Sequence, residues 1–242
     1  MTAFETILYH KDSQIAWVTL NRPHVLNVYN LAMRDELYQV LEAIRDDPEI
    51  HGAILCGSGD RAFCAGADLK EFGTSPSQTV ARQVRWERDT WGMFLDIKKP
   101  IVAAVHGYVF GSGLEMALLC DIRVASDDSC FGLPETTLGM IPSAGGTQTL
   151  PRTVGRGPAL EILLTGQCID ANQAYEFGLV TCVVPPKRLF LKAKQILERV
   201  VNSNSSVTQS IKVAVMDGMD MPLSHGLALE ARMSIPFLLS QR

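Results

Sequence analysis

The sequence predicts an α/β fold in which most strands pair in parallel. Short apolar runs alternate with helical patterns as far as about residue 150, and this alternation is typical of parallel sheets covered by helices. From residue 151 onward the strand signals thin out, and helical periodicity dominates. A length of 242 residues suits one domain, or one domain with a small appendage.

The strand predictions begin with a hairpin. Phe4–Tyr9 and Ile15–Leu20 are strand-like runs on either side of the polar segment Lys11–Ser13, which is typical of a hairpin turn. Further strands are expected where short apolar runs are bounded by glycine, proline or a charged residue: Ala53–Cys56, Ile101–Val105 and Ile122–Ala125.

The helix predictions rest on capping and on apolar spacing. Asn30 is expected to cap a helix that continues to about Asp46, because its apolar residues follow the i, i+3, i+4, i+7 spacing of one helix face (Leu37, Val40, Leu41 and Ile44). The same periodicity predicts one helix over Gln78–Ile97. Further helices are expected at Leu114–Cys120, Ala159–Leu164, Ala171–Phe177, Arg188–Val201 and Ser205–Met219.

Composition excludes several classes of protein. Apolar residues make up 47% of the chain and charged residues 20%, as in an average globular protein, so a disordered or collagen-like chain is excluded. The net charge of −4 argues against a nucleic-acid-binding surface. The first residues mix Glu5 with scattered apolar residues and do not resemble a signal peptide, so we expect a cytoplasmic location; a mature mitochondrial matrix protein stays open as an alternative.

Cysteine spacing and one apolar run bear on metals and membranes. No C-x-x-C pair or paired histidine motif occurs, so no metal site is expected, and reduced, mostly buried thiols are predicted at Cys56, Cys64, Cys120, Cys130, Cys168 and Cys182. Ile101–Cys120 is long enough to span a bilayer, but it contains His106, Glu115 and three glycines. That composition favours a strand, a turn and a helix.

The familiar nucleotide and nucleophile motifs are absent from the sequence. Gly111–Met116 begins like G-x-G-x-x-G but ends in methionine, and there is no G-x-x-x-x-G-K-[ST] loop. Neither Ser112 nor Ser143 lies between the glycines of a G-x-S-x-G elbow. Dinucleotide binding and serine hydrolase chemistry are therefore disfavoured.

Three acidic residues are candidates for chemistry. Glu115 opens an apolar helix: it is either a solvated acid at the positive helix end or a buried carboxyl available for acid–base work, and the apolar surroundings favour the second. Asp121 is expected to be structural, tied to backbone N–H groups. Glu135 follows Pro134 in a stiff turn, a pattern more typical of a helix start than of a catalytic group.

Two glycine-rich turns are candidates for binding an oxyanion. Cys64–Leu69 and Gly111–Gly113 each combine small residues with the apparent start of a helix. Free N–H groups at such starts suit a developing negative charge, although each turn alone is a common feature.

Four ordered motifs together resemble the enoyl-CoA hydratase/isomerase family, also called crotonases. Asn21–Asn27 resembles N-R-P-x-x-x-N, and Phe63–Lys70 resembles F-x-A-G-A-D-[LI]-K. His106–Ala117 resembles G-x-x-x-G-G-G-x-E-[LM]-A, and Phe131–Gln148 resembles F-x-x-P-E-x-x-x-G-x-x-P-x-x-G-G-T-Q. The resemblance covers nearly the whole chain.

The resemblance implies a fold, an assembly and a substrate. The implied fold is a crotonase-like spiral of ββα units over residues 1–185, followed by a C-terminal helical trimerisation region over residues 186–242. The implied assembly is a homotrimer or a dimer of trimers. The implied substrate is an acyl-CoA thioester, with no cofactor beyond that coenzyme A, no nucleic acid, no metal and no membrane.

The resemblance also assigns roles to residues. The backbone N–H groups of Ala67 and Ser112 would form the oxyanion hole, in which fixed dipoles stabilise an enolate-like oxygen. Glu115 would orient and deprotonate water, and Glu135 would deliver or remove the proton at the α carbon. The coenzyme A would lie along His24, Val25, Leu26, Ala65, Gly66, Asp68, Leu69 and Lys70.

Retention of both glutamates favours hydration of a linear 2-enoyl- or cyclic dienoyl-CoA. A double-bond isomerase, which often works with one acid, and a non-catalytic CoA-thioester-binding scaffold stay open as alternatives. The chain departs from the family pattern at Ser112 and Ser143, where glycine is usual. It also ends before the basic helix that often covers the adenine, and the walls of the acyl pocket are expected from Phe72–Trp91.

Overall fold

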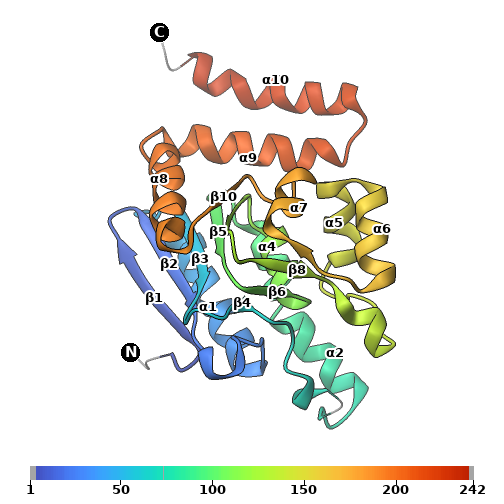
Figure 1. Ribbon diagram of the computed structural model, residues 1–242. Helices are drawn as coiled ribbons and strands as arrows, with labels where there is room; N and C mark the ends of the chain where they lie inside the picture. The colour runs from blue at the N-terminus through green and yellow to red at the C-terminus, as the bar shows by residue number, and fades with distance from the viewer. Residues whose placement is uncertain (1–3, 73, 240–242) are drawn as a thin grey trace.

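The main sheet of the protein has six strands. A computed structural model describes residues 4–72 and 74–239, and the sheet comprises β1 (Ile7–Asp12), β2 (Ile15–Leu20), β3 (Gly52–Gly57), β5 (Ile101–Val105), β7 (Ile122–Ser126) and β10 (Cys182–Val184). Their order across the sheet is β1-β2-β3-β5-β7-β10 (Figure 1). Only the β1–β2 hairpin is antiparallel among these neighbours, so the prediction of largely parallel pairing is confirmed.

A second, smaller sheet carries the loops that lead into the site. Its strands are β4 (Ala62–Cys64), β6 (Tyr108–Phe110), β8 (Cys130–Gly132) and β9 (Ile169–Asp170), in the order β4-β6-β8-β9. Each of β3, β5 and β7 in the main sheet is followed by one strand of the small sheet and then by helix. This repetition is the predicted spiral of ββα units, which the structure confirms.

Helices cover both faces of the main sheet, and three helices are the last elements of the described chain (Figure 1). They are α1 (Leu31–Asp46), α2 (Gln78–Glu87), α3 (Thr90–Asp96), α4 (Ser112–Leu119), α5 (Gly146–Val154), α6 (Arg156–Thr165), α7 (Ala171–Glu176), α8 (Leu189–Val201), α9 (Ser205–Met219) and α10 (Leu223–Leu239). Four short 3₁₀ helices complete the described chain: η1 (Pro23–Val25), η2 (Leu69–Glu71), η3 (Pro134–Leu138) and η4 (Pro186–Arg188).

Successive side chains of each strand point to opposite faces of the main sheet, so the buried apolar residues form two clusters. One face of the sheet packs with α1, α3 and α4 in the larger cluster, which includes Val18, Leu55 and Phe63. The other face packs against α8, whose Leu197 contacts the sheet so closely that a Cβ on Gly52 would lie 2.7 Å from its Cδ1. Glycine at position 52 therefore allows the close approach of α8.

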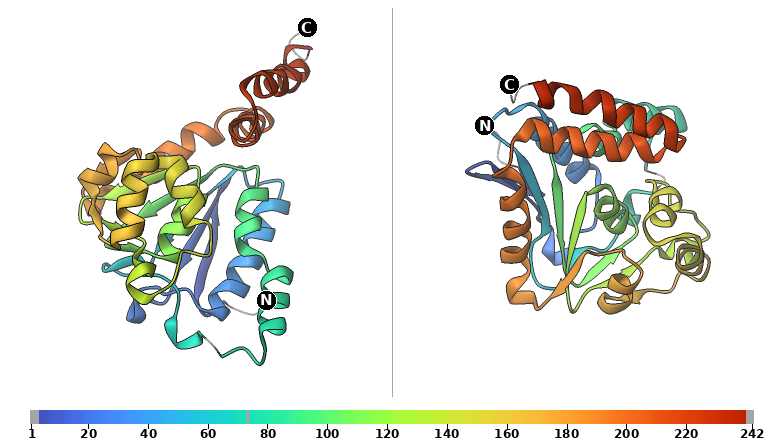
Figure 2. Two further views of the ribbon diagram at one scale, coloured as in Figure 1. Left: turned by 90° about the vertical axis from the view of Figure 1, so that its right-hand side faces the viewer. Right: turned by 90° about the horizontal axis from the view of Figure 1, so that it is seen from above.

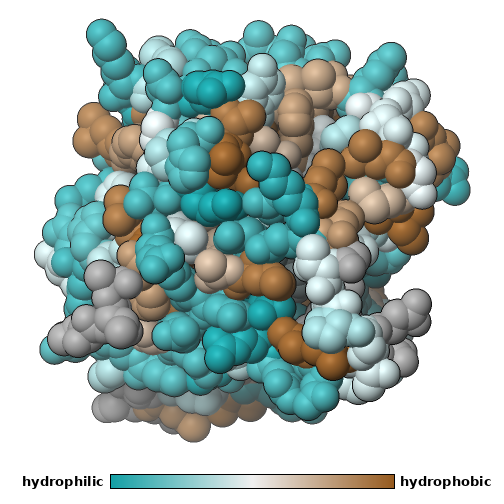
Figure 3. All heavy atoms as spheres, turned by 90° about the horizontal axis from the view of Figure 1, so that it is seen from below, coloured by the Kyte–Doolittle hydropathy of each residue, from teal (hydrophilic) through white to brown (hydrophobic). Residues whose placement is uncertain are grey.

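The last two helices form a hairpin that projects from the α/β body (Figure 2). Of the described residues 205–239, none is buried, and many apolar side chains are exposed, including Ile211, Val215, Met219, Leu223, Leu227 and Leu238. The opposite face of the molecule is mainly hydrophilic, with apolar side chains in separate groups (Figure 3). An ion pair of 2.8 Å between Lys212 and Asp121 ties α9 to the body.

Most of the predicted elements are confirmed. Asn30 caps α1 by accepting a hydrogen bond from the amide of Met33 at 2.9 Å, and α1 ends at Asp46 as predicted. The single helix predicted over 78–97 is wrong, because Asp89 breaks it and caps α3 by accepting from the amide of Gly92 at 3.0 Å. The sequence analysis missed α5, which contains Pro151, and it also missed α10 and the short strands of the second sheet.

The apolar run over 101–120 divides into β5, β6 and α4, as its glycines indicated. Within residues 4–72 and 74–239, no helix has the length and apolar character needed to cross a membrane.

Candidate active site

Glu115 is held rigidly in the first turn of α4. Its side chain is only 2% exposed, and Oε1 accepts hydrogen bonds from the amides of Ala144 and Gly146, both at 2.9 Å. The left-handed backbone of Gly145, with φ of 107°, turns the chain between these two amides. The two amide donors hold the carboxyl group of Glu115 in one orientation. The prediction that Glu115 is buried is confirmed.

Glu135 lies in η3, where Pro134 occupies the first turn. Its Oε2 is buried and has no hydrogen-bond partner among the described residues. Burial raises the pKa of Glu135, the backbone amide of Glu135 opposes this, and the negative charge of Glu115 raises it further. The protonated form of Glu135 is therefore favoured relative to a solvated glutamate.

Both carboxyl groups approach the N-terminal end of α4. Gly111 precedes that helix with φ of 49°, and a Cβ on Gly111 would lie 3.1 Å from Oε1 of Glu135. Glu115 follows four residues later and interacts electrostatically with Glu135. The structure thus brings the two predicted catalytic glutamates together from segments 20 residues apart. Two neighbouring carboxyl groups with different surroundings are suited to act as an acid and a base.

The two glycine-rich turns also meet at this point. A Cβ on Gly66 would lie 3.6 Å from the carbonyl oxygen of Phe110, and one on Gly111 would lie 3.4 Å from the Cα of Gly66. Ala67 and Ser112 are the next residues along each turn. Ser112 is the first residue of α4, so the helix supplies no acceptor for its amide. The amide of Ala67 has no acceptor among the described residues.

Tyr29 fixes the turn that carries Ala67. Its amide donates to the carbonyl of Gly66 at 2.8 Å, and its carbonyl accepts from the amide of Asp68 at 2.8 Å. These two bonds grip the chain on both sides of Ala67, which pairs with Tyr29 as an isolated parallel bridge. The backbone of the turn is therefore braced by the segment that precedes α1.

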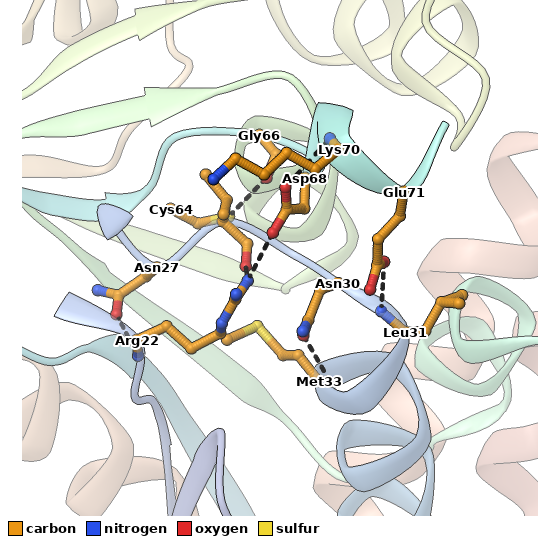
Figure 4. A network of polar contacts seen from close by, with 11 residues as sticks. Arg22, Asn27, Asn30, Leu31, Met33, Cys64, Gly66, Asp68, Lys70 and Glu71 are labelled. Atoms are coloured by element: carbon orange, nitrogen blue, oxygen red, sulfur yellow. Dashed lines mark hydrogen bonds and ion pairs between the residues drawn. The ribbon is translucent and has the colours of Figure 1, made fainter. Parts of the chain in front are cut away.

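Arg22 supports the same turn, and Asn27 holds the loop between β3 and β4; the sequence assigned a role to neither (Figure 4). Arg22 Nη1 donates to Oδ2 of Asp68 at 3.2 Å and to the carbonyl of Val28 at 2.8 Å. Asn27 is fully buried, and its Nδ2 donates to the carbonyl oxygens of Ser58 and Ala62 at 2.9 and 2.8 Å. The signal was present in the N-R-P-x-x-x-N motif, but the motif alone does not show which partners the side chains have.

The residues predicted to lie along coenzyme A form two adjacent segments. The amide of Ala65 donates to the carbonyl of Leu26 at 3.0 Å, which joins them. His24, Leu69 and Lys70 are exposed, whereas the other predicted residues are partly or fully buried: Val25, Leu26, Ala65, Gly66 and Asp68. The Asp68 carboxylate already pairs with Arg22 and caps the amide of Lys70 at 3.2 Å, so it is engaged within the protein.

The far end of α4 is also fixed. Arg123 Nη1 donates to the carbonyl oxygens of Cys120 at 2.6 Å and Ala117 at 3.3 Å, which satisfies the last turn of the helix. Burial lowers the pKa of Arg123, although a guanidinium keeps its charge in proteins. Asp121 accepts from the amide of Ile101 at 2.7 Å, so the prediction that it is structural is confirmed.

Comparison with known proteins places this geometry in a family. The family model described as enoyl-CoA hydratase/isomerase matches residues 10–240. The chain belongs to the enoyl-CoA hydratase/isomerase family. The predictions of the family, of its fold and of a hydratase-like enzyme are thereby confirmed.

Individual relatives agree with this assignment. Crotonyl-CoA hydratase of Syntrophomonas wolfei is 36% identical over 95% of this chain and 88% of its own length. (E)-benzylidenesuccinyl-CoA hydratase of Thauera aromatica is 38% identical over 89% of this chain and 84% of its own. The crystal structure of enoyl-CoA hydratase from Bacillus anthracis superposes with a TM-score of 0.90 at 37% identity, covering 95% of this chain and 89% of that one.

Proposed function

We propose that this enzyme hydrates the double bond of a 2-enoyl-CoA thioester, linear or cyclic dienoyl, to a hydroxyacyl-CoA. The observation that carries the proposal is the meeting of Glu115 and Glu135 at the N-terminus of α4, beside two turns that can present amides. Neither glutamate alone supports this chemistry, because hydration needs a base for the water and an acid for the α carbon.

In this mechanism the thioester carbonyl accepts hydrogen bonds from the amides of Ala67 and Ser112. These fixed dipoles stabilise the negative charge that develops on the oxygen when water adds at the β carbon. Glu115, held by two amides, acts as the base and removes a proton from the water while the hydroxyl joins the β carbon. Glu135, whose pKa is raised by burial, donates its proton to the α carbon. Proton exchange with solvent then restores both groups.

The proposal requires no cofactor, because coenzyme A is part of the substrate. We expect the exposed side chains of His24 and Lys70 to meet the polar end of that molecule, and the buried turn at Gly66 to lie nearer the reacting carbonyl. A linear crotonyl group and an aromatic benzylidenesuccinyl group appear in the names of two relatives, so the substrate screen should span both kinds of acyl group.

Loss of the conjugated-thioester absorbance on adding enzyme tests the proposal directly. The panel should include linear, branched, aromatic and alicyclic 2-enoyl-CoAs, with Glu115→Gln and Glu135→Gln as matched variants. We expect turnover of at least one 2-enoyl-CoA by the wild type and its loss in both variants. Full activity in both variants would contradict the mechanism, and acyl-CoA binding without turnover across the panel would indicate a scaffold instead.

Double-bond isomerisation is the second candidate. The unpartnered Oε2 of Glu135 favours it, because a single carboxyl group can carry a proton between two carbons of the acyl chain. An isomerase would act on a 3-enoyl-CoA and keep its activity in Glu115→Gln. A hydratase would not.

The projecting hairpin supports assembly into a homotrimer or a dimer of trimers. A cleft of about 260 Å³ between α9 and α10 is lined mainly by apolar residues, among them Val207, Ile211, Met233 and Phe237. Exposed apolar surface of this kind marks an interaction site. Sedimentation equilibrium should give three or six chains per particle, and a monomer would contradict this assembly.

A further inference from the structure

Two cysteines outside the candidate active site face each other across a pair of short strands. β8 and β9 pair in antiparallel register, with Cys130 opposite Asp170 and Phe131 opposite Ile169. Continuing this register places Cys168 opposite Gly132, and a Cβ on Gly132 would lie 3.5 Å from the Cα and Cβ of Cys168. Cys130 and Cys168 are therefore diagonal neighbours on one face of the strand pair.

The side chains of these two residues are neighbours, and both are accessible. Cys168 lies close enough to Cys130 to help raise its pKa. Cys168 is exposed, and Cys130 is partly exposed at the wall of a cleft of about 330 Å³ that also includes Arg61 and Tyr108. By contrast, Cys56, Cys64 and Cys120 are buried thiols.

The cysteine pair is mechanically connected to Glu135. β8 leads through Leu133 directly into η3, which carries Glu135. The loop before Cys168 packs on the same 3₁₀ helix, because a Cβ on Gly166 would lie 2.8 Å from Thr137 and 3.6 Å from Pro134. A change in the distance between the two cysteines must therefore strain the segment that positions Glu135.

We propose that Cys130 and Cys168 form a redox site, which a low-molecular-weight disulfide closes into a reversible protein disulfide that displaces Glu135. The displacement follows from distance: diagonal Cα atoms typically lie about 7–8 Å apart, whereas a disulfide usually spans at most about 6.8 Å. Closing the bond draws the strands together by about 1 Å and leaves it strained. Strained, accessible disulfides are the ones that are easily reduced again.

The chemistry is thiol–disulfide exchange. The exposed Cys168 thiolate attacks one sulfur of the small disulfide, which releases one thiol and leaves a mixed disulfide on Cys168. Cys130 then gives up its proton to solvent and attacks Sγ of Cys168, which releases the second thiol. Two protein thiols are oxidised, and one small disulfide is reduced to two thiols.

The electrostatics of Cys130 suit the second step. Burial and the neighbouring Cys168 thiol raise the pKa of Cys130 to about 12, so Cys130 does not react first at neutral pH. The contribution of Cys168 disappears once that thiol is in the mixed disulfide. Cys130 therefore becomes easier to deprotonate at the stage at which it is needed.

Glutathione disulfide serves as the probe, on the full chain after reduction and removal of the reductant. Intact mass and peptide mapping should show a Cys130–Cys168 link with the loss of two hydrogen atoms and no retained glutathione. Cys130→Ser should stop at one glutathione adduct on Cys168, and Cys168→Ser should not form the link. Cys182→Ser, which changes another partly exposed cysteine, is the matched control and should still form it. A stable glutathione adduct on wild-type Cys168 without the link would overturn the proposal.

The activity measurement rests on the proposed function, whereas the mass measurement does not. We expect oxidation to lower 2-enoyl-CoA hydration by about tenfold or more, since misplacement by 1 Å is costly in a catalytic site. Dithiothreitol should restore the rate, and Cys168→Ser should be insensitive. Unchanged hydration in the linked enzyme would overturn the effect on Glu135. Absence of turnover in both redox states would contradict the proposed function. The mass measurement would then still show whether the disulfide forms.

Discussion

The surroundings of Glu115 and Glu135 differ although the two carboxyl groups are neighbours. Glu115 is almost completely buried, yet one of its oxygens receives two amide hydrogen bonds. Glu135 is half-buried, and one of its oxygens has no partner within the described chain. Backbone donors align the Glu115 carboxyl group, whereas burial is the largest cause of the raised pKa of Glu135. This contrast supports the proposal that Glu115 acts as the base and Glu135 as the acid.

The largest effect is expected from removing either carboxyl group. Glu115→Gln and Glu135→Gln should each lower kcat by roughly 10²–10⁴-fold, the usual contribution of a positioned acid or base. Because the two groups act in one step, kcat of the double variant should be only slightly lower than kcat of the less active single variant. Steady-state kinetics on a 2-enoyl-CoA checks this. Fully multiplicative losses would show that the two groups act independently.

The β1–β2 hairpin, α1 and the burial of Glu115 were predictable because their causes are local. Asn30 and the apolar spacing after it specify α1, and the apolar residues around Glu115 indicate its burial. The meeting of Glu115 with Glu135 and of Gly66 with Gly111 depends on contacts across the ββα repeats. No local pattern encodes such contacts, so only the resemblance to a family anticipated them.

The errors also have local physical reasons. Proline inside a helix usually breaks it, which hid α5 around Pro151. The apolar period continues from α2 into α3, which hid the cap at Asp89. The strands of the small sheet are only two or three residues long, too short for any alternation to be recognised. The roles of Arg22 and Asn27 required their partners to be visible.

A substitution at Gly146 would disturb the amide hydrogen bonds that distinguish Glu115 from Glu135. A Cβ there would lie 2.9 Å from Leu133 and Pro142 and 3.1 Å from Oε1 of Glu115, so the loop must shift away from the carboxylate. Gly146→Ala should lower kcat by about 10–100-fold and the free energy of unfolding by about 1–3 kcal/mol. Gly157→Ala is the matched control, since nothing lies within 4 Å of that Cβ, and it should keep full activity.

The raised pKa of Glu135 makes a prediction for stability against pH. A carboxyl group whose pKa is higher in the folded than in the unfolded state binds protons more tightly when folded. Its contribution to stability is therefore greatest at low pH and declines as pH rises from the unfolded-state pKa through the folded-state pKa. Glu135→Gln lacks this loss, so its Tm at neutral pH should exceed that of the wild type. A lower Tm at neutral pH would show that the Glu135 carboxylate is stabilised by the fold.

The smallest effect is expected at Asp68, whose ion pair with Arg22 supports the turn that carries Ala67. Asp68→Asn keeps a side-chain acceptor for the amide of Lys70 but loses the ion pair with Arg22, whose side chains are both only 16% exposed. The free energy of unfolding should fall by about 1–2 kcal/mol, and kcat should fall several-fold because the Ala67 amide is held less firmly. Asp46→Asn, which removes a surface pair with Arg45, is the control and should change neither quantity measurably. If Asp68→Asn instead raised KM for the CoA substrate while leaving kcat and stability intact, Asp68 would be a direct contact of the coenzyme and not a brace for the turn.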